Sequence, residues 1–164
     1  MRVIFLDVDG VLNSVRSMVA LHNHRSTLDH DFIDPIAVAL VNKLIERSRA
    51  HLVISSTHRK HIPDPLGNGR SLADMQKYFD KFGIVGKVIG YTPCSKDGHR
   101  GTEIKQWLED NKGLDVTEYV IIDDDCDMLE EQLPYFVHTD NYFGFSYLNY
   151  LDALRILNSV DFPN

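Results

Sequence analysis

Three short apolar segments, each ending at a polar residue, constrain the fold of this 164-residue chain more than any other feature. They are residues 2–6 (RVIFL) followed by Asp7, residues 51–55 (HLVIS) ending in Ser55, and residues 118–123 (EYVIID) ending in Asp123. Short continuous apolar runs are typical of strands that are buried on both faces of a parallel sheet. Because parallel strands end at one edge of their sheet, we expect these three polar side chains to meet there.

Helical segments separate these strands. Asp34 followed by Pro35 predicts a helix start, because Asp caps helices and Pro fits their first position. Further helices are expected over residues 72–82, capped by Ser71, and over 102–111 and 146–158, and further strands over 87–91 and 135–139. The last helix has an apolar stripe of Tyr147, Leu148, Leu151 and Leu154. This alternation predicts an α/β fold of three layers, with helices on both faces of a central parallel sheet.

Composition excludes several classes of protein. Hydrophobic residues make up 43% and charged residues 25% of the chain, as in a soluble globular protein. No apolar run approaches the roughly 20 residues of a membrane span. The first ten residues carry an apolar run that is too short for a signal peptide and is cut by Asp7 and Asp9. The two cysteines, Cys94 and Cys126, show no metal-binding spacing, so we expect a reducing cytoplasmic location.

Charge is distributed unevenly along the chain. The net charge of -7 argues against a strong, nonspecific nucleic-acid binder. However, residues 1–101 carry 14 basic and 10 acidic residues, whereas residues 102–164 carry three and 14. The first part could therefore attract an anionic substrate, although chance and two acidic helices explain the asymmetry equally well.

The segment Asp7-Val8-Asp9-Gly10 indicates chemistry at the end of the first strand. Residues i and i+2 of an extended chain lie on the same side, so Asp7 and Asp9 should face one site. One carboxylate could then attack an electrophile while the other exchanges protons with the leaving group. The alternative is an Asp-Gly turn that merely ends an edge strand.

The sequence FLDVDGVL resembles the first motif of the haloacid dehalogenase (HAD) superfamily of phosphotransferases. The resemblance implies that Asp7 is the nucleophile that forms an aspartyl-phosphate and that Asp9 is the general acid and base. It also implies that Asp7 and the Asp9 backbone carbonyl bind Mg²⁺. Three further motifs should follow in order along the chain.

The second motif of the superfamily is a strand that ends in Ser or Thr, which hydrogen-bonds to the transferred phosphoryl group. Residues 52–55 (LVIS) resemble it, which assigns a catalytic role to Ser55. Ser56 is the alternative for this role, because the motif fits the sequence equally well when it is shifted by one residue. If Ser55 has the role, Ser56 is expected to bind substrate. Without the other motifs, Ser55 and Ser56 would indicate only the polar start of a loop.

The third motif is a Lys or Arg near a helix start. It offsets the negative charge of the nucleophile and the phosphate. Arg100, followed by Gly101, resembles it, and an Arg binds phosphate through its bidentate fork. Many members carry Lys at this position, and Lys96 is the rival assignment.

The fourth motif is a strand followed by acidic residues that complete the metal site. Residues 120–127 (VIIDDDCD) resemble it, with Asp123 and Asp124 as metal ligands and Asp127 in an outer position. Mg²⁺ prefers oxygen ligands, so this residue set suits it. An acidic helix start could explain Asp125 and Asp127, but it explains Asp123 poorly because Asp123 ends a strand.

The four motifs occur in order and cover nearly the whole chain. Their pattern is similar to that of HAD domains associated with RNA-repair enzymes. This resemblance implies one HAD-like domain over residues 1–164, with a minimal cap made of insertions at about 13–33 and 60–95. Residues 13–33 are polar and rich in His, and we expect a loop or a small lid there.

The expected function is hydrolysis of a phosphomonoester, preferably at a nucleic-acid or nucleotide phosphate end. A small metabolite or a phosphoprotein is the alternative substrate, and a non-catalytic HAD-like binding protein is the alternative class. Nothing in the sequence indicates a stable protein partner. Three basic residues of the second insertion, Arg59, Lys60 and Arg70, are candidate substrate-binding residues, although any one of them could lie in a solvated loop.

An aromatic cluster precedes the last helix and allows two interpretations. It consists of Tyr142, Phe143, Phe145 and Tyr147. Packing of the last helix against the sheet is the default interpretation, because aromatic residues dominate protein cores. Stacking on a base of the substrate is the second.

Overall fold

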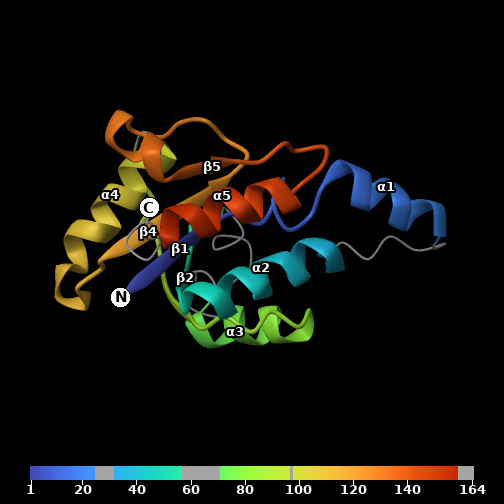
Figure 1. Cartoon of the computed structure of the whole chain (residues 1–164), viewed down its shortest axis with the longest axis horizontal. Coiled ribbons are helices and arrows are strands. Elements are labelled where there is room, and N and C mark those ends of the chain that lie inside the picture. The colour runs from blue at the N-terminus through green and yellow to red at the C-terminus, as the bar shows by residue number, and fades with distance from the viewer. Residues whose placement is uncertain (25–31, 57–70, 97, 159–164) are drawn as a thin grey trace.

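The computed structural model describes residues 1–24, 32–56, 71–96 and 98–158. Its helices and strands are β1 (Arg2–Leu6), α1 (Val15–His24), α2 (Pro35–Ser48), β2 (His51–Ile54), α3 (Leu72–Lys81), β3 (Val88–Tyr91), α4 (Arg100–Asp110), η2 (Lys112–Leu114), β4 (Glu118–Asp123), η3 (Glu130–Tyr135), β5 (Phe136–His138) and α5 (Tyr147–Leu157). The expected strands are therefore confirmed to within one or two residues. Figure 1 shows how these elements are arranged.

The described strands form a five-stranded sheet in the order β3-β2-β1-β4-β5, and every pairing is parallel. The central position of β1 follows from its composition, because each of its residues from Val3 to Leu6 is fully buried. Its neighbours on the two sides are β2 and β4, so the residues that follow these three strands come together at one edge. This is the arrangement that the three apolar runs predict.

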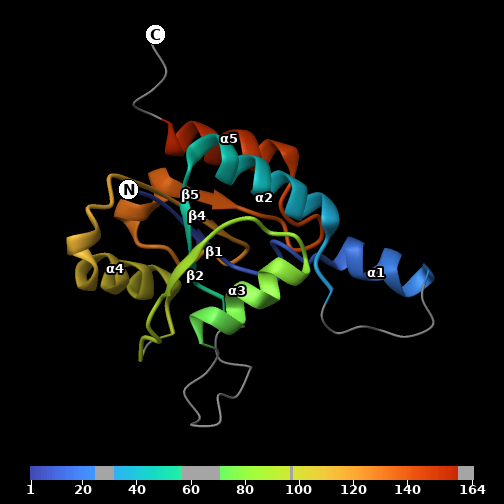
Figure 2. The ribbon, with the colours of Figure 1, turned by 90° about the horizontal axis from the view of Figure 1, so that it is seen from below.

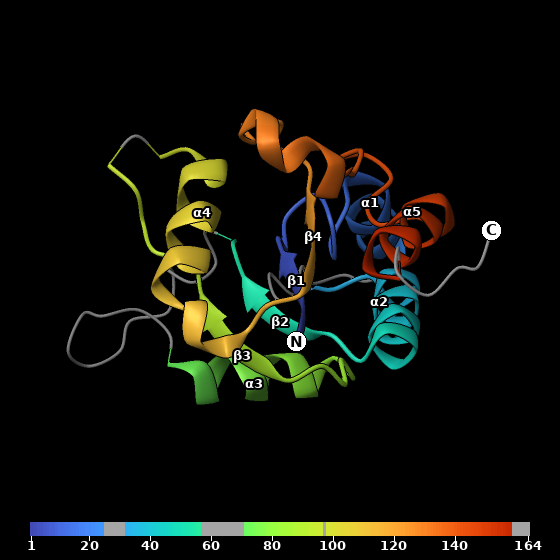
Figure 3. The same ribbon diagram turned by 60° about the vertical axis from the view of Figure 1, so that its left-hand side comes forward.

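Helices cover both faces of the sheet, which gives the expected three layers. Alternate strand residues point to opposite faces. Ile4 and Leu6 pack into a core with α2, α3 and α5, whereas Val3 and Phe5 pack into a second core with α4. Figure 3 shows α4 on one side of the sheet and α2 and α5 on the other.

Local capping fixes where the helices begin. The side chain of Asp34 accepts a hydrogen bond from Ile36 N at 2.8 Å at the start of α2. Ser71 accepts one from Asp74 N at 3.1 Å at the start of α3. Both caps were expected from the sequence, because a side-chain oxygen there satisfies an otherwise unpaired N–H of the first turn.

The two expected insertions differ in structure. Residues 15–24 of the first one form a helix, α1, which extends beyond the carboxyl ends of the strands (Figures 1 and 2). Of the two expectations for this segment, a loop or a small lid, the loop is wrong for residues 15–24, and the lid stays a prediction. The second range, 60–95, contains α3 and β3, and β3 pairs with β2 in the sheet. Residues 88–91 therefore belong to the main sheet.

The apolar stripe expected for α5 is wrong for Tyr147, Leu148 and Leu151, which are exposed, whereas Leu154 is partly buried against the core. Tyr150, Ala153 and Leu157 are the residues that α5 buries. None of the helices in the described parts of the chain combines the length and the apolar composition needed to cross a membrane.

Candidate active site

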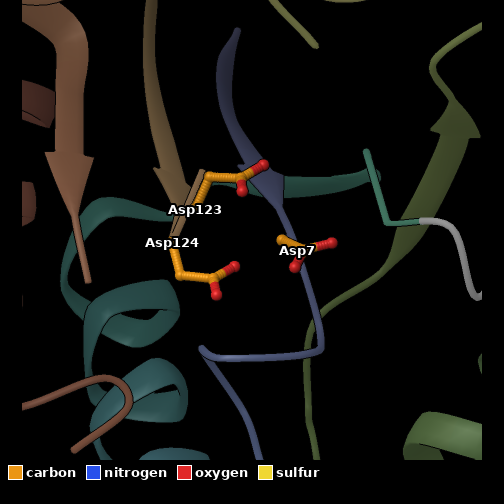
Figure 4. A group of neighbouring side chains, drawn as sticks. All are labelled: Asp7, Asp123 and Asp124. Carbon is orange, nitrogen blue, oxygen red and sulfur yellow. The ribbon is translucent and has the colours of Figure 1, made fainter. Parts of the chain in front are cut away.

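Three carboxylates meet where β1 and β4 end. Asp7 follows β1, Asp123 is the last residue of β4, and Asp124 comes next (Figure 4). One oxygen from each of the three lies within 4.8 Å of the others. Asp7 is only 5% exposed and Asp123 is fully buried. The sequence predicted this meeting because the two strands are buried and parallel.

Burial and mutual repulsion make these carboxylates hard to ionise without a cation. Burial, together with the charge of Asp123, raises the pKa of Asp7 to about 7. Burial raises the pKa of Asp123 to about 6, although Arg100 opposes the rise. Three close carboxylate oxygens are the hard ligands that Mg²⁺ prefers, and a divalent ion would offset their charge. The residues present therefore fit a magnesium ion.

Arg100, the first residue of α4, supplies the positive charge of the site. Its Nε lies 2.9 Å from an Asp123 oxygen, and one of its terminal nitrogens lies 3.6 Å from an Asp7 oxygen. The side chain is buried, so both contacts are shielded from water. Lys96, the rival for this position, is exposed. The structure therefore brings Arg100 to the carboxylates.

Two acidic residues hold Arg100 in place. Asp127 caps α4 from outside the helix, since its carboxylate accepts a hydrogen bond from Arg100 N at 2.8 Å and its carbonyl accepts one from Gly101 N at 3.2 Å. His99, at the N-cap position, makes no side-chain cap bond. Asp127 thus joins the loop after β4 to the helix that carries Arg100, and the outer position at the metal site that was expected for it stays a prediction.

Glu103 is the second of these acidic residues, and sequence reasoning missed it. It is 2% exposed, its carboxylate lies 3.5 Å from Arg100, and it accepts a hydrogen bond from Ser95 N at 3.0 Å. The spacing of three residues from Arg100 on one helix was the signal that could have found it. Glu103 therefore connects the loop before α4 to the guanidinium group.

Asp9 lies beside this cluster but is exposed. Its carboxylate accepts a hydrogen bond from Asn13 Nδ2 at 2.9 Å, and its charge contributes to the raised pKa of Asp124, which burial raises most. Gly10, with a φ of 69°, turns the chain away from the strand direction. A Cβ atom at Gly10 would lie 2.2 Å from an Asp124 oxygen, so glycine is needed for this close approach.

Ser55 and Ser56 both follow β2 and are fully buried. A side-chain hydrogen bond joins Ser56 to the Asp7 carboxyl and opposes the rise in its pKa. Ser55 N donates to Leu6 O at 3.1 Å, which continues the pairing of β1 with β2. The contact with Asp7 favours Ser56 over Ser55 as the hydroxyl group beside the nucleophile. The candidate substrate-binding residues Arg59, Lys60 and Arg70 lie outside the described residues.

The comparison with protein families agrees with this geometry. Residues 3–149 match the model of the HAD domain in Swiss Army Knife RNA repair proteins. The chain belongs to this family. The resemblance stated from the four motifs and the α/β fold with a parallel sheet are therefore confirmed. No curated protein and no solved structure matches the chain. Membership of this HAD family supports a phosphoesterase-type hydrolase.

Proposed function

We propose that this HAD domain is a magnesium-dependent phosphomonoesterase that acts on the phosphate ends of nucleic acids or nucleotides. The arrangement of charged groups around Asp7 is the strongest support for this proposal. A buried carboxylate, Asp7, has an oxygen within 4.8 Å of oxygens of two further carboxylates, and one of its oxygens lies 3.6 Å from a nitrogen of a buried arginine. An isolated structural ion pair would not need three acids around one cation, whereas a site for a metal ion and a phosphoryl group does.

In the first step, a carboxylate oxygen of Asp7 attacks phosphorus. The bond between phosphorus and the leaving oxygen breaks, and Asp9 gives its proton to that oxygen. The exposure of Asp9 supports this role, because a general acid has to reach the leaving group. Arg100 and the Ser56 hydroxyl are suited to bind phosphoryl oxygens, since both already contact Asp7.

In the second step, water attacks phosphorus of the aspartyl-phosphate and gives a proton to Asp9. The bond between phosphorus and the Asp7 oxygen breaks, which releases inorganic phosphate, restores the Asp7 carboxylate and leaves Asp9 protonated for the next cycle. Mg²⁺, when bound, offsets charge on the phosphoryl oxygens. Asp7, Asp123 and Asp124 would hold it, together with the Asp9 backbone carbonyl that the family resemblance implies.

The substrate class is supported by the family and by the charge distribution. The matching family is described as the HAD domain in RNA repair proteins, which supports a nucleic-acid phosphate end as the substrate. Residues 1–101, with their basic excess, include the candidate substrate-binding residues Arg59, Lys60 and Arg70. We propose a reducing location such as the cytoplasm because Cys94 and Cys126 are both free thiols.

Phosphate release by the purified protein tests the proposal. Substrates should include oligonucleotides with a 3′- or 5′-phosphate, mononucleotides, sugar phosphates and a phosphopeptide, each with Mg²⁺ or with EDTA. We expect turnover of nucleic-acid ends with Mg²⁺ and none in Asp7→Asn. Asp152→Asn is the matched control, since it removes an exposed carboxylate on α5. Turnover in a folded Asp7→Asn protein would rule out the aspartyl-phosphate, and inactivity on every substrate would favour a binding protein.

A further inference from the structure

The aromatic cluster before α5 does not pack as a unit. Phe145 is buried in the core, but Tyr142, Phe143 and Tyr147 are each more than half exposed. Packing of the last helix, which the sequence favoured, therefore accounts for Phe145 and in part for Tyr147, whose ring centre lies 5.8 Å from that of the buried Tyr150. Tyr142 and Phe143 remain exposed on the turn before α5, where their rings are available to contact a ligand.

Phe143 forms one wall of a cavity of about 340 Å³. This volume is within the range of about 300–1,000 Å³ that is typical of small-molecule pockets. Arg16, from the start of α1, lies over the Phe143 ring with its guanidinium carbon 5.7 Å from the ring centre. His138 and Leu148 also line the cavity. A flat cation, an aromatic face and an imidazole are the groups on which nucleic-acid bases stack.

The turn that carries Phe143 is held by several hydrogen bonds. The Asp140 carboxylate accepts hydrogen bonds from Tyr142 N at 2.8 Å and Phe143 N at 3.1 Å. Gly144 has a φ of 70° and donates its N–H to Asp140 O at 2.7 Å. Arg16 N donates to Tyr142 O at 3.0 Å, which fixes α1 to the same turn. Phe143 and Arg16 are therefore positioned by the backbone.

The cavity adjoins the carboxylate cluster. His138, in its wall, lies 2.9 Å from the backbone carbonyl of Asp124 through Nε2. The Asp124 side chain belongs to the metal-binding group and is hydrogen-bonded by Asn141, in the same turn as Phe143. The same turn also contacts the loop after β1, because Phe145 N donates to Val11 O at 2.9 Å, just after the Asp9-Gly10 segment. Asp124 thus contacts both regions, since its side chain belongs to the carboxylate group and its backbone carbonyl contacts His138 in the cavity wall.

We propose that this cavity binds the base of the nucleotide that carries the reacting phosphate, stacked on Phe143 and Arg16. The inference rests on the proposed function, because it takes the reacting phosphate to be that of a nucleotide. It adds a base-binding subsite that distinguishes a nucleotide end from other phosphomonoesters. Stacking on an aromatic face is tolerant of sequence, so the subsite accepts any of the bases.

Equilibrium binding tests the subsite without turnover. The ligands are fluorescent oligoribonucleotides that carry a phosphate at the 3′ or the 5′ end. In one set the terminal nucleotide has its base, and in the other it is abasic. Binding is measured by anisotropy in an Asp7→Asn background. We expect Phe143→Ala to weaken binding of the base-bearing ligand about tenfold and that of the abasic ligand much less. Phe143→Leu, which keeps an apolar side chain, should lose nearly as much.

Tyr147→Ala is the matched control, since Tyr147 is 56% exposed, close to the 53% of Phe143, and does not line the cavity. It should leave both affinities unchanged. The proposal of a base-binding subsite would be overturned if Phe143→Ala, with a normal melting temperature, lost affinity equally for the two ligands or lost none. A loss of self-association instead would identify the surface as a contact between copies and would also overturn it. Phosphate release by the wild-type protein is scored separately, so failure of the proposed function is distinguishable from failure of the subsite.

Discussion

The guanidinium Nε of Arg100 lies 2.9 Å from an oxygen of Asp123, and the same side chain reaches to within 3.6 Å of Asp7. One buried cation thereby joins the residue that follows β1 to the last residue of β4. A planar group with donors on several sides can serve both carboxylates at once, whereas an ammonium group is a single point charge. The chain thus has a geometric reason for arginine where many superfamily members carry lysine.

Arg100→Lys should therefore impair the site more than a conservative change normally does. We expect kcat/KM for a phosphorylated oligonucleotide to fall at least about tenfold, because a lysine cannot keep both contacts. Arg155→Lys is the control, since Arg155 forms an exposed ion pair with Asp152 at 3.4 Å. Exposed pairs contribute about 0–1 kcal/mol, so this variant should match the wild type. Steady-state kinetics that show no difference between the two variants would contradict the bridging role of Arg100.

Thermal stability without metal should decrease as pH rises. The pKa of Asp7 is raised to about 7 and that of Asp123 to about 6, above the value of 3.8 for an unperturbed aspartate. The folded protein therefore binds more protons than the unfolded chain between about pH 4 and 7, and stability is lost across this window. In EDTA, we expect Tm to be higher at pH 5 than at pH 7.5, and Asp7→Asn should weaken this dependence.

Magnesium should reverse this trend, because it binds the ionised carboxylates and competes with protons. The rise in Tm on adding Mg²⁺ should be larger at pH 7.5 than at pH 5. Differential scanning fluorimetry at several Mg²⁺ concentrations measures the effect. An increase in Tm that is independent of pH, or that persists when Asp123 and Asp124 are both changed to Asn, would show that the ion binds elsewhere.

Asp127→Ala should reduce activity and stability together. Loss of a helix cap costs about 0.5–2 kcal/mol, and here the capped residue is Arg100 itself. The matched control is Ser71→Ala, which removes the cap of α3. Both variants should lower the free energy of unfolding by similar amounts, measured by urea denaturation. A fall in kcat of several-fold is expected in Asp127→Ala alone, and equal kcat in the two would show that Asp127 only stabilises the fold.

Gly10→Ala should weaken the magnesium site. Its φ is 69°, and a Cβ there would overlap the Asp124 carboxylate. We expect the Mg²⁺ concentration for half-maximal activity to rise about tenfold. Gly83→Ala imposes the same kind of backbone strain, at a φ of 78°, in a place where a Cβ meets no atom within 4 Å. Both variants should lose about 1–2 kcal/mol of stability. A normal magnesium requirement in Gly10→Ala would mean that Asp124 does not bind the ion.

The meeting of Asp7 and Asp123 was predictable because strand burial and parallel pairing both appear in the sequence pattern. The choice between Ser55 and Ser56 was not, since a shift of one residue turns a side chain to the other face of a strand. The residue types alone do not determine which of the two serines points toward the site. The hydroxyl that reaches Asp7 is identified only when the path of the chain after β2 is known.

Helix α5 shows a second case in which the spacing of apolar residues does not predict which side chains are buried. The expected stripe is Tyr147, Leu148, Leu151 and Leu154, and Tyr150, Ala153 and Leu157 form another that shares the partly buried Leu154 side of the helix. Both have helical spacing, so the pattern alone does not decide which stripe faces the sheet. The smaller Ala153 allows close approach to the core, and the second stripe is the buried one. Glu103 was missed for a related reason, because its spacing from Arg100 is visible but its burial is not.

The pairing of β1 with β4 has a consequence for how the protein acquires activity. Arg2 is in register with Glu118, so this ladder joins segments more than 110 residues apart along the chain. Closing such a long loop is entropically unfavourable, and folds dominated by distant contacts form slowly. Asp7 and Asp123 become neighbours only when this ladder has formed. Recovery of phosphatase activity during refolding should therefore lag behind the recovery of helical circular dichroism.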